Sequence, residues 1–190
     1  MILQEDKIRL KYPNAFIRDL SLVSEVVYHS TAGFSDYEKF IEWVLSGERD
    51  REYQNNIGLF HFVIEPNGGI HQIFDYKNWF YHSSSGKHDR RTIGIECMNP
   101  SPQNDVELTN EQYASLIDLT FNEIFSKFKI SYIVGHSMNG LIYSNVYKNT
   151  PYCPGKVFKW SLIENELLSR KINYVKYLKG ERFIILPNEK

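Results

Sequence analysis

Short runs of apolar, β-branched and aromatic residues recur along the chain and predict strands. They cover residues 22–28, 57–65, 91–99 and 131–136. The second run leads into the turn sequence PNGG at 66–69 and then into IHQIF, a combination that predicts a β-hairpin. The pattern therefore indicates several short strands, two of which are neighbours in one hairpin.

Helical periodicity fills the intervals between these runs. Ser35 and Glu38 have the spacing of a capping box, and the apolar residues that follow share one helical face until Gly47, a natural helix stop. Thr109 and Gln112 show the same spacing before the longest amphipathic stripe, which consists of Tyr113, Leu116, Ile117, Phe121, Ile124, Phe125 and Phe128. A stripe of this composition belongs to a core.

The order of these elements defines the expected architecture. A last long helix is predicted over 156–171, and a terminal hairpin is suggested within 172–190. The resulting order β-α-β-β-β-α-β-α indicates an α/β fold with one mixed sheet flanked by helices. At 190 residues the chain fits a single domain over 1–190, with a core over about 22–171 and an N-terminal extension over 1–21.

Composition excludes several classes of protein. Hydrophobic residues make up 42% and charged residues 24%, as in a folded globular protein, and the net charge of -1 gives no pull toward nucleic acid. No apolar stretch approaches the roughly 20 residues that span a bilayer, so membrane insertion is not expected. Charges in MILQEDKIRL occupy the place of a signal peptide's apolar segment, so we expect cytoplasmic synthesis. We also expect a monomer.

Three residues far apart in the chain have the chemistry of zinc ligands. His29 in VVYHSTAG, His136 in YIVGHSMNG and Cys153 in TPYCPG each stand at or near the end of an apolar run, where a strand would deliver a side chain to the rim of a sheet. Two imidazoles and a thiolate leave one corner of a tetrahedron for water, which is typical of a catalytic zinc site. The pattern indicates one Zn²⁺ per chain and a metallohydrolase.

The stretch YIVGHSMNG also resembles the nucleophile elbow of α/β-hydrolases, with Ser137 as the nucleophile. Two features argue against this interpretation. The motif G-x-S-x-G requires glycine two residues after the serine, where Asn139 stands. That fold also places its catalytic histidine after the serine, whereas no histidine follows His136. We therefore reject a serine hydrolase.

Six stretches occur in a fixed order: VVYHSTAG, FHFVIEPNGGIHQIFD, FYHSSSG, TIGIECMNP, IVGHS and CPGKVFKW. Together they resemble the type-2 N-acetylmuramoyl-L-alanine amidases, the family of phage lysozyme-amidases, muropeptide-recycling amidases and peptidoglycan recognition proteins. Family patterns matched in this way include H-F-x-I-x-x-x-G-x-I, W-H-A-G, S-I-G-I-E and (D/C)-P-G-x-x-F-x-W. The resemblance runs from about residue 22 to about residue 160, which is most of the chain.

The resemblance implies a metal, a reaction and a partner. His29 and His136 would be zinc ligands, and Cys153 would be the third, at a position where relatives carry Cys or Asp. The implied reaction is hydrolysis of the amide between the lactyl group of N-acetylmuramic acid and L-alanine, in peptidoglycan or in muropeptides. Because water activated by the metal is the nucleophile in such a reaction, Cys153 would act as a ligand only.

Glu96 is the residue expected to act as general base. A carboxylate inside the apolar run TIGIEC is costly to bury unless it has a function or a partner. By the resemblance, recycling and phage amidases carry a catalytic Glu here, whereas pairing with Arg90 or Arg91 is the structural alternative. Strand alternation directs Cys97 to the opposite face, into the core, and a disulfide between Cys97 and Cys153 stays open.

The sequence departs from the family pattern at two places. Phe60 stands where many relatives have a catalytic Tyr, which is consistent with Glu96 as the base, and we assign Phe60 to substrate binding. Pro151 stands where a Lys or Thr usually helps to stabilise the oxyanion. Thr150 and Lys148 lie close by in the sequence, and Lys156 lies just beyond. The segment between His136 and Cys153 is longer than in most relatives, and it either repositions Lys148 or shapes substrate choice. We assign Lys148 to catalysis and Thr150 to substrate binding.

His82 in FYHSSSG corresponds to a groove position of the family and is predicted to contact substrate, with a packing role as the alternative. Some recognition proteins of the same fold bind peptidoglycan without cutting it, typically after losing the third ligand. Because Cys153 and Glu96 are present, an enzyme is favoured over a non-catalytic binding module. Three settings fit the absence of a signal peptide: a phage endolysin that reaches the cell wall after release, a cytoplasmic enzyme that recycles muropeptides, and a bacterial protein secreted by a dedicated machine.

Overall fold

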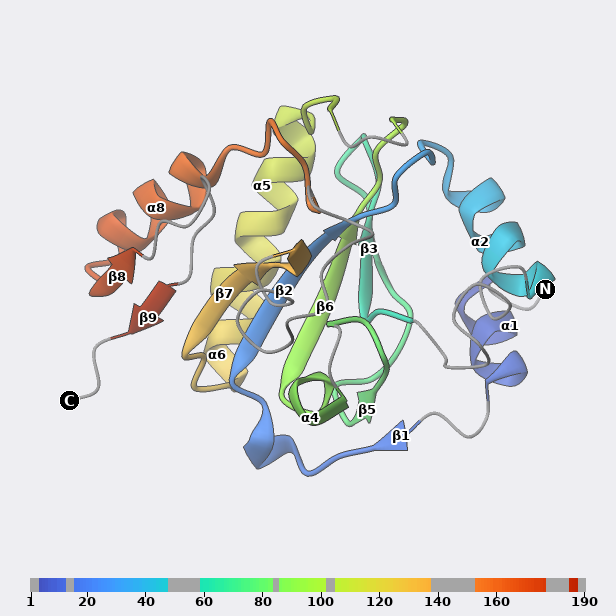
Figure 1. Ribbon diagram of the computed structural model, residues 1–190, viewed down its shortest axis with the longest axis horizontal. Coiled ribbons are helices and arrows are strands. Elements are labelled where there is room, and N and C mark those ends of the chain that lie inside the picture. Colours follow the sequence, from blue (N-terminus) through green and yellow to red (C-terminus); the bar gives the residue numbers. More distant parts are fainter. Residues whose placement is uncertain are drawn as a thin grey trace.

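The computed structural model of the protein describes residues 4–12, 16–47, 59–83, 86–101, 105–137, 153–176 and 185–187. Its centre is a five-stranded mixed sheet in the order β4-β3-β6-β2-β7 (Figure 1). The strands are β2 (Glu25–Ser30), β3 (Phe62–Ile64), β4 (Ile70–Gln72), β6 (Thr92–Cys97) and β7 (Tyr132–Gly135). The α/β class with one mixed sheet and flanking helices is confirmed.

Three parallel pairings form the middle of the sheet. β2 lies between β6 and β7 and is parallel to both, and β3 is parallel to β6. The predicted hairpin is confirmed, because β3 pairs antiparallel with β4 across a turn in which Gly68 has a φ of 86°. All residues of β2 and β6 are buried, as expected for parallel strands with both faces covered.

One face of the sheet is apolar and carries the larger core. Alternate residues of the central strands, including Tyr28, Ile95 and Cys97, pack there in one cluster. The covering helices are α5 (Asn110–Asp118), the π-helical η2 (Leu119–Ile124), α6 (Phe125–Lys127) and α8 (Trp160–Ser169). The predicted capping box of α5 is present, since Thr109 accepts from the Gln112 N–H and Gln112 accepts in return from the Thr109 N–H.

The other face of the sheet is divided. Near β3 it is covered by a second apolar cluster, to which α1 (Gln4–Lys11) and α2 (Tyr37–Ser46) contribute Ile8, Phe40, Ile41 and Val44. In Figure 1 these two helices lie beyond the β3 side of the sheet, at the right. On β2 and β6 the same face instead carries polar residues, namely Glu25, His29, Thr92 and Glu96, all buried. This polar row contains the site described below.

Smaller elements surround the sheet. β1 (Phe16–Ile17) pairs with β5 (Asn78–Trp79), and β8 (Tyr174–Lys176) pairs antiparallel with β9 (Ile185–Pro187) near β7. The helix α4 (Gly86–Asp89) precedes β6, and the 3-10 turn η1 (Leu20–Leu22) precedes β2. Among the described residues, no helix is long and apolar enough to cross a membrane.

Three local expectations are wrong in detail. The first strand starts at Glu25 rather than at residue 22, because Asp19 accepts the Ser21 N–H and thereby caps η1. The cap of α2 is Asp36 rather than Ser35, since the Asp36 carboxylate accepts the Lys39 N–H. The long helix changes to π-helical hydrogen bonding over η2, which periodicity alone does not predict.

Candidate metal site

His29, His136 and Cys153 converge in the structure. One donor atom from each lies within 4.8 Å of the donor atoms of the other two. The two imidazole rings are 4.5 Å apart between centroids. His29 and Cys153 are buried, and His136 is half-buried. Residues 107 and 124 positions apart along the chain (136 minus 29, and 153 minus 29) therefore form one cluster.

The sheet register explains how the two histidines meet. β2 and β7 are parallel neighbours in which Tyr28 pairs with Gly135, so His29 and His136 follow directly at the carboxyl ends of the two strands. Residues at paired positions of neighbouring parallel strands project from the same face. Because Tyr28 belongs to the apolar face, both histidines belong to the polar one.

Hydrogen bonds hold Cys153 against these strand ends. Its carbonyl oxygen accepts from the Ser137 hydroxyl at 2.7 Å and from the Ser137 N–H at 3.2 Å. The Ser30 N–H donates to Sγ at 3.4 Å, a contact that favours the thiolate. A Cβ on Gly135 would meet Pro154 Cδ at 2.7 Å, so only glycine lets this segment lie so close to β7. Ser137 is fully buried and donates to Cys153, which is consistent with rejecting the serine-hydrolase interpretation.

The donor set fits a zinc ion. Two imidazole nitrogens and a thiolate sulfur suit a borderline-soft cation, and ligands of tetrahedral zinc stand about 3.3–3.8 Å apart. Donor atoms within 4.8 Å of one another need shifts on the order of 1 Å to reach that arrangement. Three protein ligands leave the fourth tetrahedral position to water or substrate.

Glu96 lies beside this cluster. In the parallel register of β2 and β6, Glu96 is the partner of His29, and its side chain is 5% exposed. The two arginines weighed as partners for Glu96 are engaged elsewhere, close to the other end of β6. Arg91 contacts Glu25, with Nε 3.5 Å from Oε1, and the Arg90 guanidinium lies over the ring of Trp79.

His82 contacts the candidate ligand His29. His82 Nδ1 is 3.0 Å from His29 Nε2, and the His82 ring rests on Gly94, where an added Cβ would come within 2.9 Å of it. His82 is 7% exposed. Its expected contact with substrate stays a prediction, and no sequence pattern indicated that it would contact a candidate ligand.

The other predicted site residues are distributed as follows. The ring of Phe60 is fully buried in the second apolar cluster against Phe40, and its assignment to substrate binding stays a prediction. Lys148, Thr150 and Pro151 lie outside the described residues. Cys97 is in the larger core, where burial raises the pKa of its thiol, and both Cys97 and Cys153 are free cysteines.

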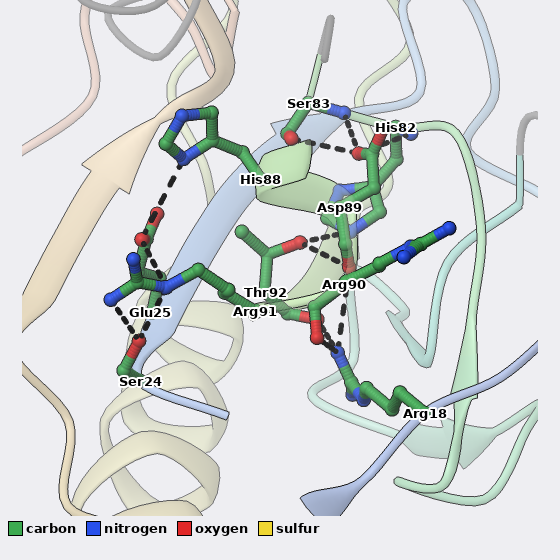
Figure 2. Close-up of polar contacts among 10 residues, drawn as sticks. All are labelled: Arg18, Ser24, Glu25, His82, Ser83, His88, Asp89, Arg90, Arg91 and Thr92. Carbon is green, nitrogen blue, oxygen red and sulfur yellow. Dashed lines mark hydrogen bonds and ion pairs between the residues drawn. The ribbon is translucent and has the colours of Figure 1, made fainter. Parts of the chain in front are cut away.

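Two buried carboxylates that were not predicted from the sequence, Asp89 and Glu25, lie near the start of β6 (Figure 2). Asp89 accepts hydrogen bonds from the His82 N–H, the Ser83 N–H and the Ser83 hydroxyl, yet burial still raises its pKa to about 6. Burial likewise raises the pKa of Glu25 to about 7, with Arg91 partly opposing the shift. Asp89 stands among charged residues in the sequence, so no hydropathy signal marked it as buried. Glu25 lies inside the apolar run LVSEVVY, so the reasoning that singled out Glu96 could have found it.

His61 is a further buried group without a predicted role. Its Nδ1 accepts the Gly94 N–H at 3.1 Å and its Nε2 is 2.9 Å from the carbonyl oxygen of Asn78. Burial lowers its pKa to about 3, and the charge of Arg18 acts in the same direction. A neutral His61 therefore helps to fix Gly94, the residue on which His82 rests.

The parallel strands β2 and β7 bring two histidines together at their carboxyl ends, where Cys153 joins them, and this arrangement defines a candidate metalloprotein. Comparison of sequences gives the family: residues 19–156 match the family described as N-acetylmuramoyl-L-alanine amidase. The matched segment covers more than half of the chain, and the protein belongs to this family. A search of curated proteins finds no match.

Solved structures show the same fold. The endolysin N-acetylmuramoyl-L-alanine amidase LysCS from Clostridium intestinale URNW is 20% identical, with a TM-score of 0.59 over 83% of this chain and 90% of that one. Peptidoglycan recognition protein LE, solved in complex with tracheal cytotoxin, is 15% identical, with a TM-score of 0.60 over 80% and 84%. The recognition protein SA of Apis mellifera is 14% identical, with a TM-score of 0.54 over 82% and 92%. At these identities the likeness establishes the fold.

Proposed function

We propose that this protein is a zinc-dependent amidase that cleaves the bond between N-acetylmuramic acid and L-alanine in peptidoglycan or muropeptides. The observation that carries the proposal is the His29, His136 and Cys153 cluster beside a buried Glu96. Membership of the amidase family supplies the substrate class. A complete donor set and an adjacent carboxylate are what such hydrolysis needs.

The metal would be held by one nitrogen from each histidine and by the Cys153 sulfur. Zinc bound there supplies Lewis-acid polarisation of the scissile carbonyl and activation of a water molecule. The thiolate partly neutralises the charge of the ion, and the Ser30 N–H helps to hold the sulfur in its anionic form. Ser137 holds the backbone of Cys153 directly after His136, which keeps the third ligand beside the second.

Glu96 performs the proton transfers in this proposal. It accepts the proton that water loses as the oxygen bonds to the lactyl carbonyl carbon. It then delivers that proton to the nitrogen of L-alanine as the amide C–N bond breaks, so that acid and amine are released. Its place beside His29 in the register puts the carboxylate next to the metal ligands, where a general base is needed.

The alternative is a non-catalytic module that binds peptidoglycan. Recognition protein LE, which has this fold, was solved with tracheal cytotoxin bound. Here the presence of Cys153 together with Glu96 favours the enzyme, because a binding module needs neither a third ligand nor a base.

The deciding experiment measures zinc content, muropeptide binding and release of L-alanyl peptide on the same preparations. Wild type and Glu96→Gln should each hold one zinc per chain and bind muropeptide, and only wild type should release peptide. Glu111→Gln, on the exposed face of α5, is the matched control and should behave as wild type. Binding and zinc without release by wild type would establish the binding module, and wild type without zinc would refute the metal site.

The biological setting follows from substrate preference. We propose action either on the cell wall after release, as an endolysin, or on soluble muropeptides in the cytoplasm. Digestion of intact sacculi in parallel with soluble anhydro-muropeptides separates the two. An endolysin should solubilise sacculi, whereas a recycling enzyme should act on the soluble fragments alone.

A further inference from the structure

A chain of buried hydrogen bonds leads away from the candidate metal site along one face of β6. His29 Nε2 is 3.0 Å from His82 Nδ1, and His82 Nε2 is 2.8 Å from the Thr92 hydroxyl. That hydroxyl is also 3.2 Å from the carbonyl oxygen of Asp89. Figure 2 shows the inner part of this chain, with the Thr92 hydroxyl between His82 and Asp89. All four residues are at most 7% exposed.

Proton counting gives this chain a direction. A hydroxyl has one proton, and a carbonyl oxygen can only accept. If Thr92 donates to Asp89, its oxygen accepts from His82, which places the proton of neutral His82 on Nε2 and its lone pair on Nδ1. His29 must then donate from Nε2. The lone pair of a neutral His29 consequently lies on Nδ1, and a lone pair is what a metal ion requires of an imidazole nitrogen.

The surroundings of His82 fix its ring from three sides. The Asp89 carboxylate accepts the backbone N–H groups of His82 and Ser83, at 3.0 and 2.7 Å. Thr92 holds the far nitrogen of the ring. Gly94, two residues further along the same face of β6, leaves the space that the ring occupies, since a Cβ there would lie 2.9 Å from both Cε1 and Nδ1.

We propose that His82, held by Thr92 and Asp89, is a positioning residue that fixes the tautomer and the orientation of His29 for zinc binding through Nδ1. Partners of this kind around a metal-bound histidine set which ring nitrogen carries the proton, and their loss typically lowers metal affinity 10–100-fold. The inference rests on the proposed zinc site. It gives His82 a function that does not require contact with substrate.

Zinc affinity, measured by competition with a chelator on the full chain, tests the proposal without any substrate. His82→Leu removes the acceptor for His29 and should weaken zinc binding about 10–100-fold. His82→Asn keeps an amide oxygen near the position of Nδ1 and should recover most of that loss. Thr92→Val should weaken binding by a smaller factor, and Thr92→Ser, which keeps the hydroxyl, should not.

The matched control is Thr120→Val. Thr120 is also a fully buried threonine, and its hydroxyl is 3.0 Å from the Tyr28 hydroxyl on the other face of β2. This variant should lose stability as Thr92→Val does and should keep wild-type zinc affinity. Equal zinc affinity in wild type, His82→Leu and Thr92→Val would overturn the positioning role.

A spectroscopic measurement examines the proton arrangement itself. In long-range ¹H–¹⁵N spectra of the zinc-loaded protein, His29 should carry its proton on Nε2 and bind zinc through Nδ1, and His82 should be protonated on Nε2. A His29 protonated on Nδ1 would overturn the inference. Zinc binding without hydrolysis would refute only the proposed function, whereas wild type without zinc would refute both.

Discussion

His29 and Glu96 are paired residues in the parallel register of β2 and β6. The pairing places the carboxylate expected to move protons directly beside a residue expected to hold the metal, on the same face of the sheet. The same register gives Cys97 to the apolar core, one residue further along β6. A shift by a single residue would exchange these two faces, so the register of two central strands defines the site.

Zinc binding should depend on Cys153 and not on Cys97. Cys153→Ala removes the thiolate and should reduce zinc affinity by at least about 100-fold, because only two neutral imidazole ligands would remain. Cys153→Asp should retain zinc, because a carboxylate oxygen is also a zinc ligand. The measurement is chelator competition on each purified variant.

Cys97→Ala provides the control for this prediction. It removes the other buried free cysteine and should cost on the order of 1–2 kcal/mol of stability through a small cavity. Its zinc stoichiometry should stay at one per chain. Loss of zinc from Cys97→Ala at temperatures where the variant is folded would contradict the assignment of the ligands.

Gly94→Ala should weaken zinc binding although Gly94 is not a proposed ligand, because the substitution displaces the His82 ring. The new Cβ would lie 2.9 Å from the His82 ring, closer than real contacts allow, so the ring must move away from His29 or β6 must shift. We expect a loss of about 1–3 kcal/mol of stability from overpacking. We also expect the melting temperature to rise less on addition of zinc than it does for wild type.

The comparison for Gly94→Ala is Gly86→Ala. A Cβ at Gly86 would meet the Tyr81 ring at 3.0 Å, and that ring is half-buried and can turn aside. Gly86→Ala should therefore show the same rise in melting temperature with zinc as wild type. An undiminished rise in Gly94→Ala would mean that the position of His82 does not matter to the metal.

The sequence was sufficient for the strands, the main helix and the candidate ligands, because each depends on local pattern. Apolar runs mark β2, β6 and β7, and His29 and His136 stand at their ends. The chain of buried hydrogen bonds from His29 through His82 to Thr92 was not predictable in this way. Thr92 and Gly94 are ordinary strand residues in sequence, and their roles arise only because the His82 ring packs against the polar face of β6.

The position of the N-terminal helix α1 also could not be predicted from the local sequence pattern. Residues 4–11 are polar in sequence, and most of what α1 buries is Ile8, in a cluster formed with α2 and β3. Tertiary contacts such as Arg9 to the carbonyl oxygens of Gln72 and Ile73 define its place. Local periodicity cannot predict contacts of this kind, because the partners are more than sixty residues away along the chain.

Folding stability should depend on pH through Glu25. Its side chain is 1% exposed, and burial raises its pKa from an ordinary value near 4.5 to about 7. Between these values the folded protein binds a proton that the unfolded chain has lost, so stability falls as the pH rises from about 4.5 to about 7 and then levels off. Glu25→Gln cannot ionise and should lack this decline.

The difference in unfolding free energy between Glu25→Gln and wild type should thus grow in favour of the variant by up to about 3 kcal/mol across that window. Urea denaturation at a series of pH values measures it. Two basic groups face this carboxylate, His88 Nδ1 at 3.7 Å and Arg91 Nε at 3.5 Å, and the exposed Glu111→Gln serves as reference. A difference independent of pH would mean that Glu25 is ionised throughout in the folded protein.

Ser137→Ala separates the zinc mechanism from a serine hydrolase most directly. The Ser137 hydroxyl is fully buried and donates to the carbonyl oxygen of Cys153, which also accepts the Ser137 N–H. Because the N–H remains, we expect a loss of about 1 kcal/mol of stability and zinc binding weakened only a few-fold. Release of L-alanyl peptide should persist and stay sensitive to chelator. If Ser137 were the nucleophile, the variant would keep its zinc and release no peptide, and the metal would then have to be structural.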